Sequence, residues 1–335
     1  MSADAQKTLF HPFDTGDLEV PQAGGRVLFY GAEPGFILPE GFSASITLVQ
    51  GFRPSFLKLQ AGRHVVVPEP AGEGYDMALV LIGRHRGLNE ARLADAWDRV
   101  REGGLIVAAG SRDDGGDSLR RRVASRLDLE GSLSKYHGSV FWMRKQAGLE
   151  GPVATADPDL PINGRFFTSP GMFSHERIDP GSRLLAENLP VDLSGVVADF
   201  CAGWGYLSTE LLLRCPKVTA LELFEADHAS LEAAKRNLAG SRLEPAFHWQ
   251  DLASEPVARR FDAIVMNPPF HLGSKGDPAI GATMIRAASA ALKPNGRLIM
   301  VGNRHLPYEA ALAASFRQAS EIVRDQSFKV LSARR

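Results

Sequence analysis

The sequence predicts an α/β protein made of two tandem copies of one unit, each a mostly parallel sheet with helices on both faces. Short apolar strands alternate with helical stretches along the chain of 335 residues, which is the pattern of a doubly wound sheet. Each half has an apolar strand ending in a glycine turn, a later strand beginning with an aromatic residue and an aspartate, and a final apolar strand with a basic end. We therefore expect an internal duplication.

Three pairs of segments define this repeat. They match 27–35 with 196–205, 75–80 with 261–266, and 102–107 with 295–300. The segment 151–163 is rich in Gly, Pro, Ala and Asp and has neither helical nor strand periodicity, so we take it as a linker. This division gives a first domain at 1–150 and a second at 164–335.

The second domain shows the alternation of strands and helices most clearly. Its central strands are apolar on both faces, as in a parallel sheet covered by helices, and such sheets bind ligands at the carboxyl ends of their strands. We expect strands near 196–200, 218–223, 246–250, 262–266, 297–302 and 327–333, and helices near 206–214, 228–239, 279–292 and 308–319.

The composition sets limits on partners and location. A formal net charge of −1 gives no global basic field, so any contact with nucleic acid has to use local patches. The two cysteines, Cys201 and Cys215, and the scattered histidines give no zinc spacing. No signal peptide or membrane span is evident. We expect a cytoplasmic protein with no metal and no membrane partner.

The turn after the strand at 196–200 is a candidate cofactor site. It reads DFCAGWG, and Gly203 and Gly205 allow the backbone to approach a ligand closely. The turn has neither the GxGxxG of a dinucleotide site nor the GK[ST] of a phosphate loop. Asp199 at the strand end would repel a pyrophosphate but suits a cationic amino group, which S-adenosylmethionine has. We therefore expect Asp199, Ala202, Gly203 and Gly205 to bind S-adenosylmethionine.

Two more acidic residues stand where this cofactor needs acceptors. Glu225 follows the second strand, and a carboxylate there can accept from both ribose hydroxyls. Asp251 closes the third strand and can accept from the adenine amine. A structural alternative is that Glu225 and Asp227 only cap the helix that begins near His228.

The motif Asn267-Pro268-Pro269-Phe270-His271 follows the apolar strand at 262–266 and is the candidate catalytic site. Neither proline has an N–H, so the strand must stop pairing there. The Asn267 side-chain oxygen and the Pro268 carbonyl can then accept both N–H groups of an exocyclic amine and direct its lone pair at a methyl donor. Phe270 would stack on a base. His271 would orient the base or accept a proton, or it is simply a surface histidine.

DFCAGWG, FEAD, QD and NPPFH, in this order and spacing, resemble the class I methyltransferases that have an NPP[YF] motif. The segment TSPGMFSHERIDPGSRLL at 168–185 is similar to the PGVFS…D.GS.LL lead-in of the ribosomal RNA small subunit methyltransferase C family. The resemblance implies two tandem Rossmann-like methyltransferase folds, the second of them seven-stranded. It also implies methylation of the N2 amine of a guanine in 16S ribosomal RNA, within the small subunit or its precursor, with S-adenosylmethionine as the donor.

The sequence departs from this family at two places. Cys201-Ala202 stands where the family commonly has Gly-Cys, and the residues after His271 differ from the usual continuation. In the first half, Tyr30 ends the first strand in place of an acidic residue, and 82–86 replaces the NPPF motif. We expect this domain to bind RNA rather than cofactor. The candidate RNA-binding residues are basic: Arg84, Arg86, Arg120, Arg121, Arg122, Arg126 and Lys135. Acidic residues lie nearby in the sequence, so the alternative is an ordinary solvated surface.

Other functions remain open on the sequence alone. The NPP geometry fits any planar NH₂ group, so the substrate amine can also be that of a 23S ribosomal guanine, an adenine N6 or a protein glutamine amide. A protein that binds RNA or assists assembly without catalysis is a further alternative, although Asp199, Asn267 and Pro268 are intact.

Overall fold

The computed structural model describes residues 3–153, 161–269 and 278–335. The chain divides into two compact units, Met1–Asp157 and Pro158–Arg335. Each unit is described by itself. Within the described ranges, no helix has the length and apolar character needed to cross a membrane.

The second unit contains one seven-stranded sheet in the order β10-β9-β8-β11-β12-β14-β13. The strands are parallel except β14, which is antiparallel to both of its neighbours. Their bounds are β8 (Gly195–Phe200), β9 (Val218–Glu225), β10 (Ala246–Trp249), β11 (Phe261–Met266), β12 (Leu292–Asn303), β13 (Gln318–Arg324) and β14 (Phe328–Arg334).

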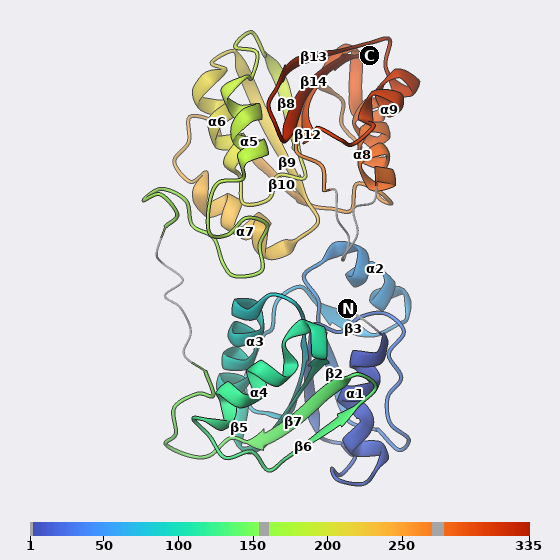
Figure 1. Ribbon diagram of the computed structural model, residues 1–335, viewed down its shortest axis with the longest axis vertical. Helices are drawn as coiled ribbons and strands as arrows, with labels where there is room; N and C mark the ends of the chain where they lie inside the picture. The colour runs from blue at the N-terminus through green and yellow to red at the C-terminus, as the bar shows by residue number, and fades with distance from the viewer. Residues whose placement is uncertain (1–2, 154–160, 270–277) are drawn as a thin grey trace. The chain divides into compact units, whose positions relative to one another are not determined.

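Helices cover both faces of this sheet (Figure 1). One apolar cluster packs α5, α6 and α7 against strand residues such as Val197 and Val265, and a second packs α8 and α9 against Phe200 and Met266. The sheet is therefore buried on both faces, as expected for apolar central strands. The helices are α5 (Pro180–Glu187), α6 (Tyr206–Arg214), α7 (His228–Asn237), α8 (Pro278–Ala291) and α9 (Tyr308–Ser315).

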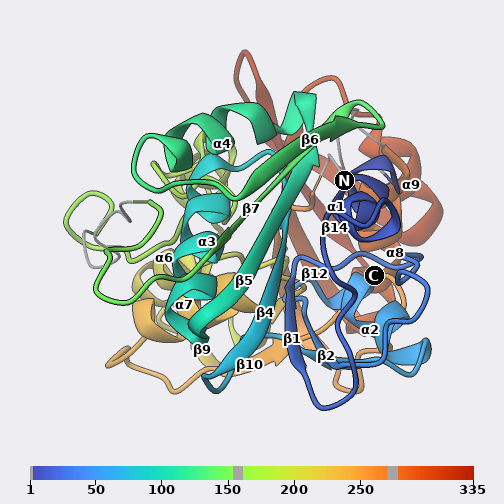
Figure 2. The same ribbon diagram turned by 90° about the horizontal axis from the view of Figure 1, so that it is seen from below.

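The first unit has the same strand order, β3-β2-β1-β4-β5-β7-β6. Figure 2 shows α1 and α2 on one side of its sheet and α3 and α4 on the other. The strands are β1 (Arg26–Tyr30), β2 (Ser45–Val49), β3 (Val65–Val67), β4 (Tyr75–Ile82), β5 (Val100–Ser111), β6 (Gly131–Lys135) and β7 (Gly138–Arg144). The helices are α1 (Ala3–Asp14), α2 (Arg53–Ala61), α3 (Arg86–Arg99) and α4 (Gly116–Ala124), with a short 3₁₀ turn at Arg112–Asp114.

The two units match element by element, which confirms the predicted pair of tandem α/β folds. They differ in one helix: α6 follows β8 in the second unit, whereas residues 31–44 after β1 contain no helix. The first unit therefore lacks the helix that follows the glycine turn.

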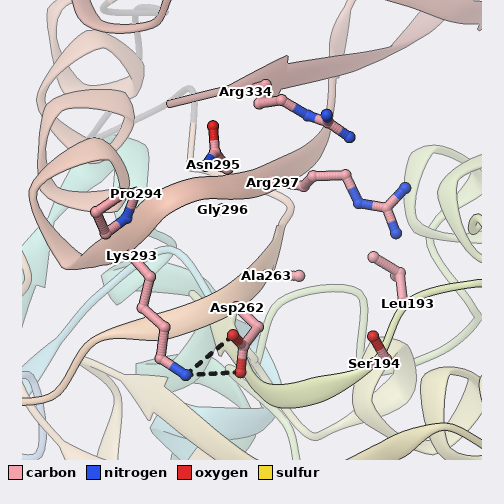
Figure 3. A pocket seen from close by; sticks show the side chains of 10 residues that line it. All are labelled: Leu193, Ser194, Asp262, Ala263, Lys293, Pro294, Asn295, Gly296, Arg297 and Arg334. Atoms are coloured by element: carbon pink, nitrogen blue, oxygen red, sulfur yellow. Dashed lines mark hydrogen bonds and ion pairs between the residues drawn. The ribbon is translucent and has the colours of Figure 1, made fainter.

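An aspartate holds the amino-terminal edge of both sheets in the same way. Asp262 Oδ2 accepts from the Val196 N–H at 2.8 Å, and Lys293 Nζ lies 2.9 Å from both carboxylate oxygens. Figure 3 shows this ion pair in a pocket that Arg297 and Arg334 also line. In the first unit, Asp76 accepts from the Arg26 N–H at 2.8 Å and pairs with Arg101 at 2.7 Å. Because these contacts are equivalent, they show which residues of the two units correspond to each other.

Two predicted elements need correction. The helix expected over 308–319 ends at Ser315, because Phe316 is extended and the chain turns into β13. This edge strand is almost wholly exposed, so it lacks the apolar alternation that identifies a half-buried strand. In addition, α5 was not among the expected helices, although Asp179 caps it and Pro180 begins it.

Candidate active site

Asp199 lies at the carboxyl end of β8 and is completely buried. Its Oδ2 accepts from the Ser208 hydroxyl at 2.8 Å, while its Oδ1 has no hydrogen-bond partner. Burial raises the pKa of Asp199 to about 7. A buried carboxylate oxygen without a donor is costly unless a ligand supplies one. This environment suits the cationic amine of S-adenosylmethionine.

Glu225 ends β9 and faces the glycine turn. Its Oε2 accepts from the Gly203 N–H at 2.7 Å, and its Oε1 accepts from the N–H groups of Ala226 and Asp227 at 2.8 and 2.9 Å. Burial raises the pKa of Glu225 to about 7. The helix cap proper is Asp227, whose Oδ1 accepts from the Ser230 N–H at 2.8 Å. Glu225 is therefore a brace between β9 and the turn, with a fixed carboxylate.

Asp251 lies just beyond β10, and its carboxylate accepts from Ala253 N–H at 2.9 Å and from Ser254 Oγ at 2.5 Å. Asp199, Glu225 and Asp251 are all close enough to Cys201 to raise the pKa of its thiol, after burial, which is the main cause. The three acids that the sequence singled out thus lie near the same residue of the turn.

The glycine turn has the backbone that its sequence requires. Gly203 and Gly205 have φ values of 54° and 86°, in the left-handed region that glycine adopts freely. Cys201 is also left-handed, at φ 59°, a conformation that costs a residue with a side chain more than it costs glycine. The first unit has Gly31 at the corresponding place, with φ 72°.

Asn267 follows β11 and is held by the N-terminus of α5. Its Nδ2 donates to Asp179 Oδ2 at 3.1 Å and to Ser182 Oγ at 2.8 Å. Asp179 Oδ2 also accepts from the Ser182 N–H at 2.7 Å, which caps the helix. Within the same motif, the Pro268 side chain is buried and that of Pro269 is exposed. Phe270 and His271 lie outside the described residues.

A cavity joins Asn267 to the glycine turn. Beside it, Phe173 is 57% exposed although its carbonyl oxygen accepts from Trp204 Nε1 at 2.9 Å. The residues that line the cavity are Phe173, Ser174, Asp179, Ser182, Cys201, Ala202, Gly203, Trp204, Tyr206, Leu207 and Asn267. The predicted catalytic asparagine and four residues of the predicted cofactor turn, 201–204, therefore border one space.

Sequence reasoning missed several residues that position this site. Ser208 holds Asp199, and Asn237 ties the lead-in to the turn through Phe167 and the Trp204 carbonyl. Asp179 and Ser182 belong to the D.GS.LL pattern, which indicates the family resemblance but predicts no role for these two residues. A buried serine in the otherwise apolar face of α6 was the available signal for Ser208.

The register shared by the units shows what the first unit has at these positions. Phe29 corresponds to Asp199, so the predicted comparison with Tyr30 is one residue out of register. Gln50 corresponds to Glu225, and it donates to the Ala32 carbonyl at 2.8 Å. Leu81, within β4, corresponds to Asn267. Neither the two carboxylates nor the asparagine is retained in the first unit.

Other candidate residues have partners of their own. Glu222, a second acidic residue on β9, forms hydrogen bonds with His248 and Arg259. Of the seven candidate basic residues of the first unit, five make ion pairs with nearby acids: Arg84, Arg86, Arg120, Arg122 and Arg126. In the described part of the chain, no cluster of three His, Cys, Asp or Glu residues is arranged to hold a metal ion.

Comparisons with known proteins agree with this geometry. The family model described as methyltransferase small domain matches residues 163–332. A ribosomal RNA small subunit methyltransferase C from Psychromonas ingrahamii is 28% identical over 271 residues, covering 77% of this chain and 75% of the relative. One from Erwinia tasmaniensis is 36% identical over 236 residues, covering 70% of this chain and 64% of the relative.

A solved structure extends the match to both units. It is a T. thermophilus 16S rRNA N2 methyltransferase in complex with AdoMet and guanosine, with a TM-score of 0.79 and 24% identity. The alignment covers 99% of this chain and 91% of that chain. This likeness shows the fold, including the paired α/β architecture.

Proposed function

The chain belongs to the methyltransferase small domain family, and we propose that it transfers a methyl group from S-adenosylmethionine to the exocyclic N2 amine of a guanine in 16S ribosomal RNA. The relatives named ribosomal RNA small subunit methyltransferase C support this substrate. The structure with the same paired fold is that of a 16S rRNA N2 methyltransferase bound to AdoMet and guanosine.

The proposal depends most on one observation: Asn267 and the glycine turn border the same cavity. Next to that turn, Asp199 has a buried oxygen without a donor, and Glu225 holds a carboxylate fixed by three backbone N–H groups. We assign Asp199 to the cofactor amine, Glu225 to the ribose and Asp251 to the adenine, with Ala202, Gly203 and Gly205 supplying the close backbone surface. When bound, S-adenosylmethionine supplies an electrophilic methyl group.

The chain's own part in the reaction is to hold the target amine. The Asn267 oxygen and the Pro268 carbonyl accept its two N–H groups and so favour the pyramidal nitrogen of the transition state over the planar ground state. We assign the base to the exposed ring of Phe173. We also assign to base binding Phe270 and His271, which belong to the same motif as Asn267. Catalysis is then mainly positioning and electrostatics.

We assign substrate recognition to the first unit. Phe29, Gln50 and Leu81 stand at the positions of the three acceptor side chains, and the helix after β1 is missing, so this unit is not suited to the cofactor. Of the seven candidate basic residues there, five pair with nearby acids, which leaves Arg121 and Lys135 as the first candidates for phosphate contacts.

We place the reaction in the small ribosomal subunit or its precursor, in the cytoplasm. The test is nucleoside mass spectrometry of ribosomal RNA from cells that lack the protein, followed by mapping of the missing methyl group. Loss of one N2-methylguanosine from 16S RNA, restored by the wild-type chain and not by Asn267→Ala, is the expected result. Intact 16S methylation with loss from 23S RNA or from a protein glutamine would reject the assignment.

A further inference from the structure

We propose that Asp179 and Ser182 are positioning residues for the reaction, setting the direction and the acceptor strength of the Asn267 side-chain oxygen. This inference rests on the proposed function. Its starting point is that both hydrogen bonds of the Asn267 amide nitrogen go to the first turn of α5, 3.1 Å to Asp179 Oδ2 and 2.8 Å to Ser182 Oγ.

The carboxylate decides which way the amide faces. An ionised carboxylate has acceptors only, so the nitrogen of Asn267 and not its oxygen must face Asp179. The oxygen, bonded to the same carbon as that nitrogen, is thereby directed away from α5. With alanine at 179, the Ser182 hydroxyl alone would remain, and a hydroxyl can either donate or accept. The amide would then be free to flip and present N–H groups to a substrate that offers N–H groups.

Asp179 is itself fixed by the fold. Its Oδ2 accepts from the Ser182 N–H at 2.7 Å, so the atom that holds Asn267 also caps α5. The start of α5 packs closely on β14: a Cβ added at Gly181 would lie 2.9 Å from the Phe328 ring. The position of Asn267 thus depends on a helix cap, Asp179, that lies 88 residues before it in the chain.

The negative charge has a second effect. Hydrogen bonds from an amide nitrogen to a charged acceptor are stronger than neutral ones, and they shift electron density toward the amide oxygen. This effect favours the transition state more than the bound substrate, so it should appear in kcat.

The structure allows charge and geometry to be separated. Because a single oxygen of Asp179 makes both contacts, Asp179→Asn can keep the cap and the bond to Asn267 while losing the charge. Asp179→Ala loses all three. Asp262→Ala is the matched control, since Asp262 also accepts from one backbone N–H and one side-chain nitrogen, at the amino-terminal edge of the second unit's sheet.

The experiment measures kcat and KM on small subunits from cells that lack the protein, with S-adenosylmethionine Kd and Tm for each variant. We expect Asp179→Ala to lower kcat at least tenfold, Asp179→Asn to lower it less, and Asp262→Ala to leave it unchanged. Cofactor Kd should stay within about twofold. Combined with Asn267→Ala, Asp179→Ala should cause no further loss, because both changes remove the same interaction.

Three results would overturn the inference. One is a normal kcat in Asp179→Ala while Asn267→Ala is inactive, which would reduce Asp179 to a helix cap and leave the proposed function standing. Another is a cofactor Kd that rises in step with the lost rate, which would make Asp179 a cofactor ligand. The third is losses that multiply in the double variant. Failure of the wild-type chain to methylate the subunits would reject the proposed function together with the inference.

Discussion

Gln50 occupies in the first sheet the place that Glu225 occupies in the second. Each lies at the carboxyl end of its strand and accepts, at 2.9 Å, from the N–H of the residue two positions later. They differ toward the turn, where Gln50 donates to the Ala32 carbonyl and Glu225 accepts from the Gly203 N–H. One position thus makes the same backbone contact in both units but has the opposite hydrogen-bond direction toward the turn.

The first prediction follows from this exchange. Glu225→Gln should weaken S-adenosylmethionine binding about tenfold or more, because a hydrogen bond to a charged group contributes roughly 1.5–3 kcal/mol. The reverse change, Gln50→Glu, should not create a second site, since Phe29 still replaces the acid of β8. Calorimetry should give one site per chain for the wild type. Two sites, or an unchanged affinity in Glu225→Gln, would contradict this assignment of roles.

The second prediction concerns pH. Burial raises the pKa of Asp199 and of Glu225 to about 7. Each carboxyl must be ionised to accept from a cationic or hydroxyl donor, so cofactor affinity should rise about tenfold per group between pH 6 and pH 8. Binding should also release protons, which calorimetry in buffers of different ionisation enthalpy detects. An affinity that does not change across this range would show that neither group titrates on binding.

The same pKa values predict the stability of the ligand-free protein. A carboxyl with a higher pKa in the folded state binds more protons when folded, so its stabilising contribution is present below pH 4 and is lost as the pH rises to about 7. Asp199→Asn removes this loss for the fully buried group. We expect a higher Tm than wild type at pH 8, an advantage that falls to nothing as the pH is lowered to about 4, and weaker cofactor binding. A lower Tm at pH 8 would show that the buried charge is compensated.

The third prediction uses the aspartate brace. Asp262→Ala should destabilise the second unit by roughly 1–2 kcal/mol, through the lost bond to the Val196 N–H and, to a smaller extent, the exposed ion pair with Lys293. Asp76→Ala should do the same to the first unit. Hydrogen–deuterium exchange reports the two units separately. Cofactor affinity should be normal in both variants; a weakened affinity in Asp262→Ala would assign this edge a part in ligand binding.

The sequence predicted the parts of the fold and site that depend on local patterns. Apolar strands, the glycine turn around Gly203 and the proline stop after Asn267 are each set by neighbouring residues. The partners of these residues were not predictable. Asn267 bonds residues 88 and 85 positions away, and Asp199 depends on Ser208 across the turn. Such contacts leave no periodicity in the sequence, and only the folded register shows that Phe29 replaces Asp199.

The fourth prediction concerns Phe173, an exposed ring beside the cavity. Stacking of a base on an aromatic side chain contributes about 1–3 kcal/mol, so Phe173→Ala should lower kcat/KM for RNA about tenfold or more. Cofactor Kd should not change, since Trp204 is held by the Phe173 carbonyl and not by its ring. Leu213→Ala, at another exposed apolar residue, is the control. Equal activity in the two variants would remove Phe173 from the substrate site.

The last prediction concerns Asn267. Asn267→Ala should lower kcat on the order of 10²-fold or more, as removal of one preorganised polar group does at other active sites, with little change in cofactor affinity. Aspartate keeps an acceptor oxygen, so from the sequence some activity is expected in Asn267→Asp. The structure predicts otherwise, because the second oxygen would face Asp179, which now accepts from Nδ2 at 3.1 Å. Two carboxylates at this distance repel and share a proton.

Exchanging the two residues should relieve that repulsion. In the double variant Asp179→Asn/Asn267→Asp, the amide nitrogen at 179 donates to the carboxylate at 267, and the free oxygen at 267 again faces the cavity. That nitrogen cannot accept from the Ser182 N–H, so the exchange regains the bond and loses the α5 cap. The Tm of the double variant, compared with that of Asn267→Asp, measures the cost of the lost cap. We expect this variant to methylate at least tenfold faster than Asn267→Asp alone, under saturating RNA and cofactor. Both should bind S-adenosylmethionine as the wild type does. If the exchanged pair is as inactive as Asn267→Asp, the hydrogen bond between 179 and 267 does not direct the catalytic oxygen.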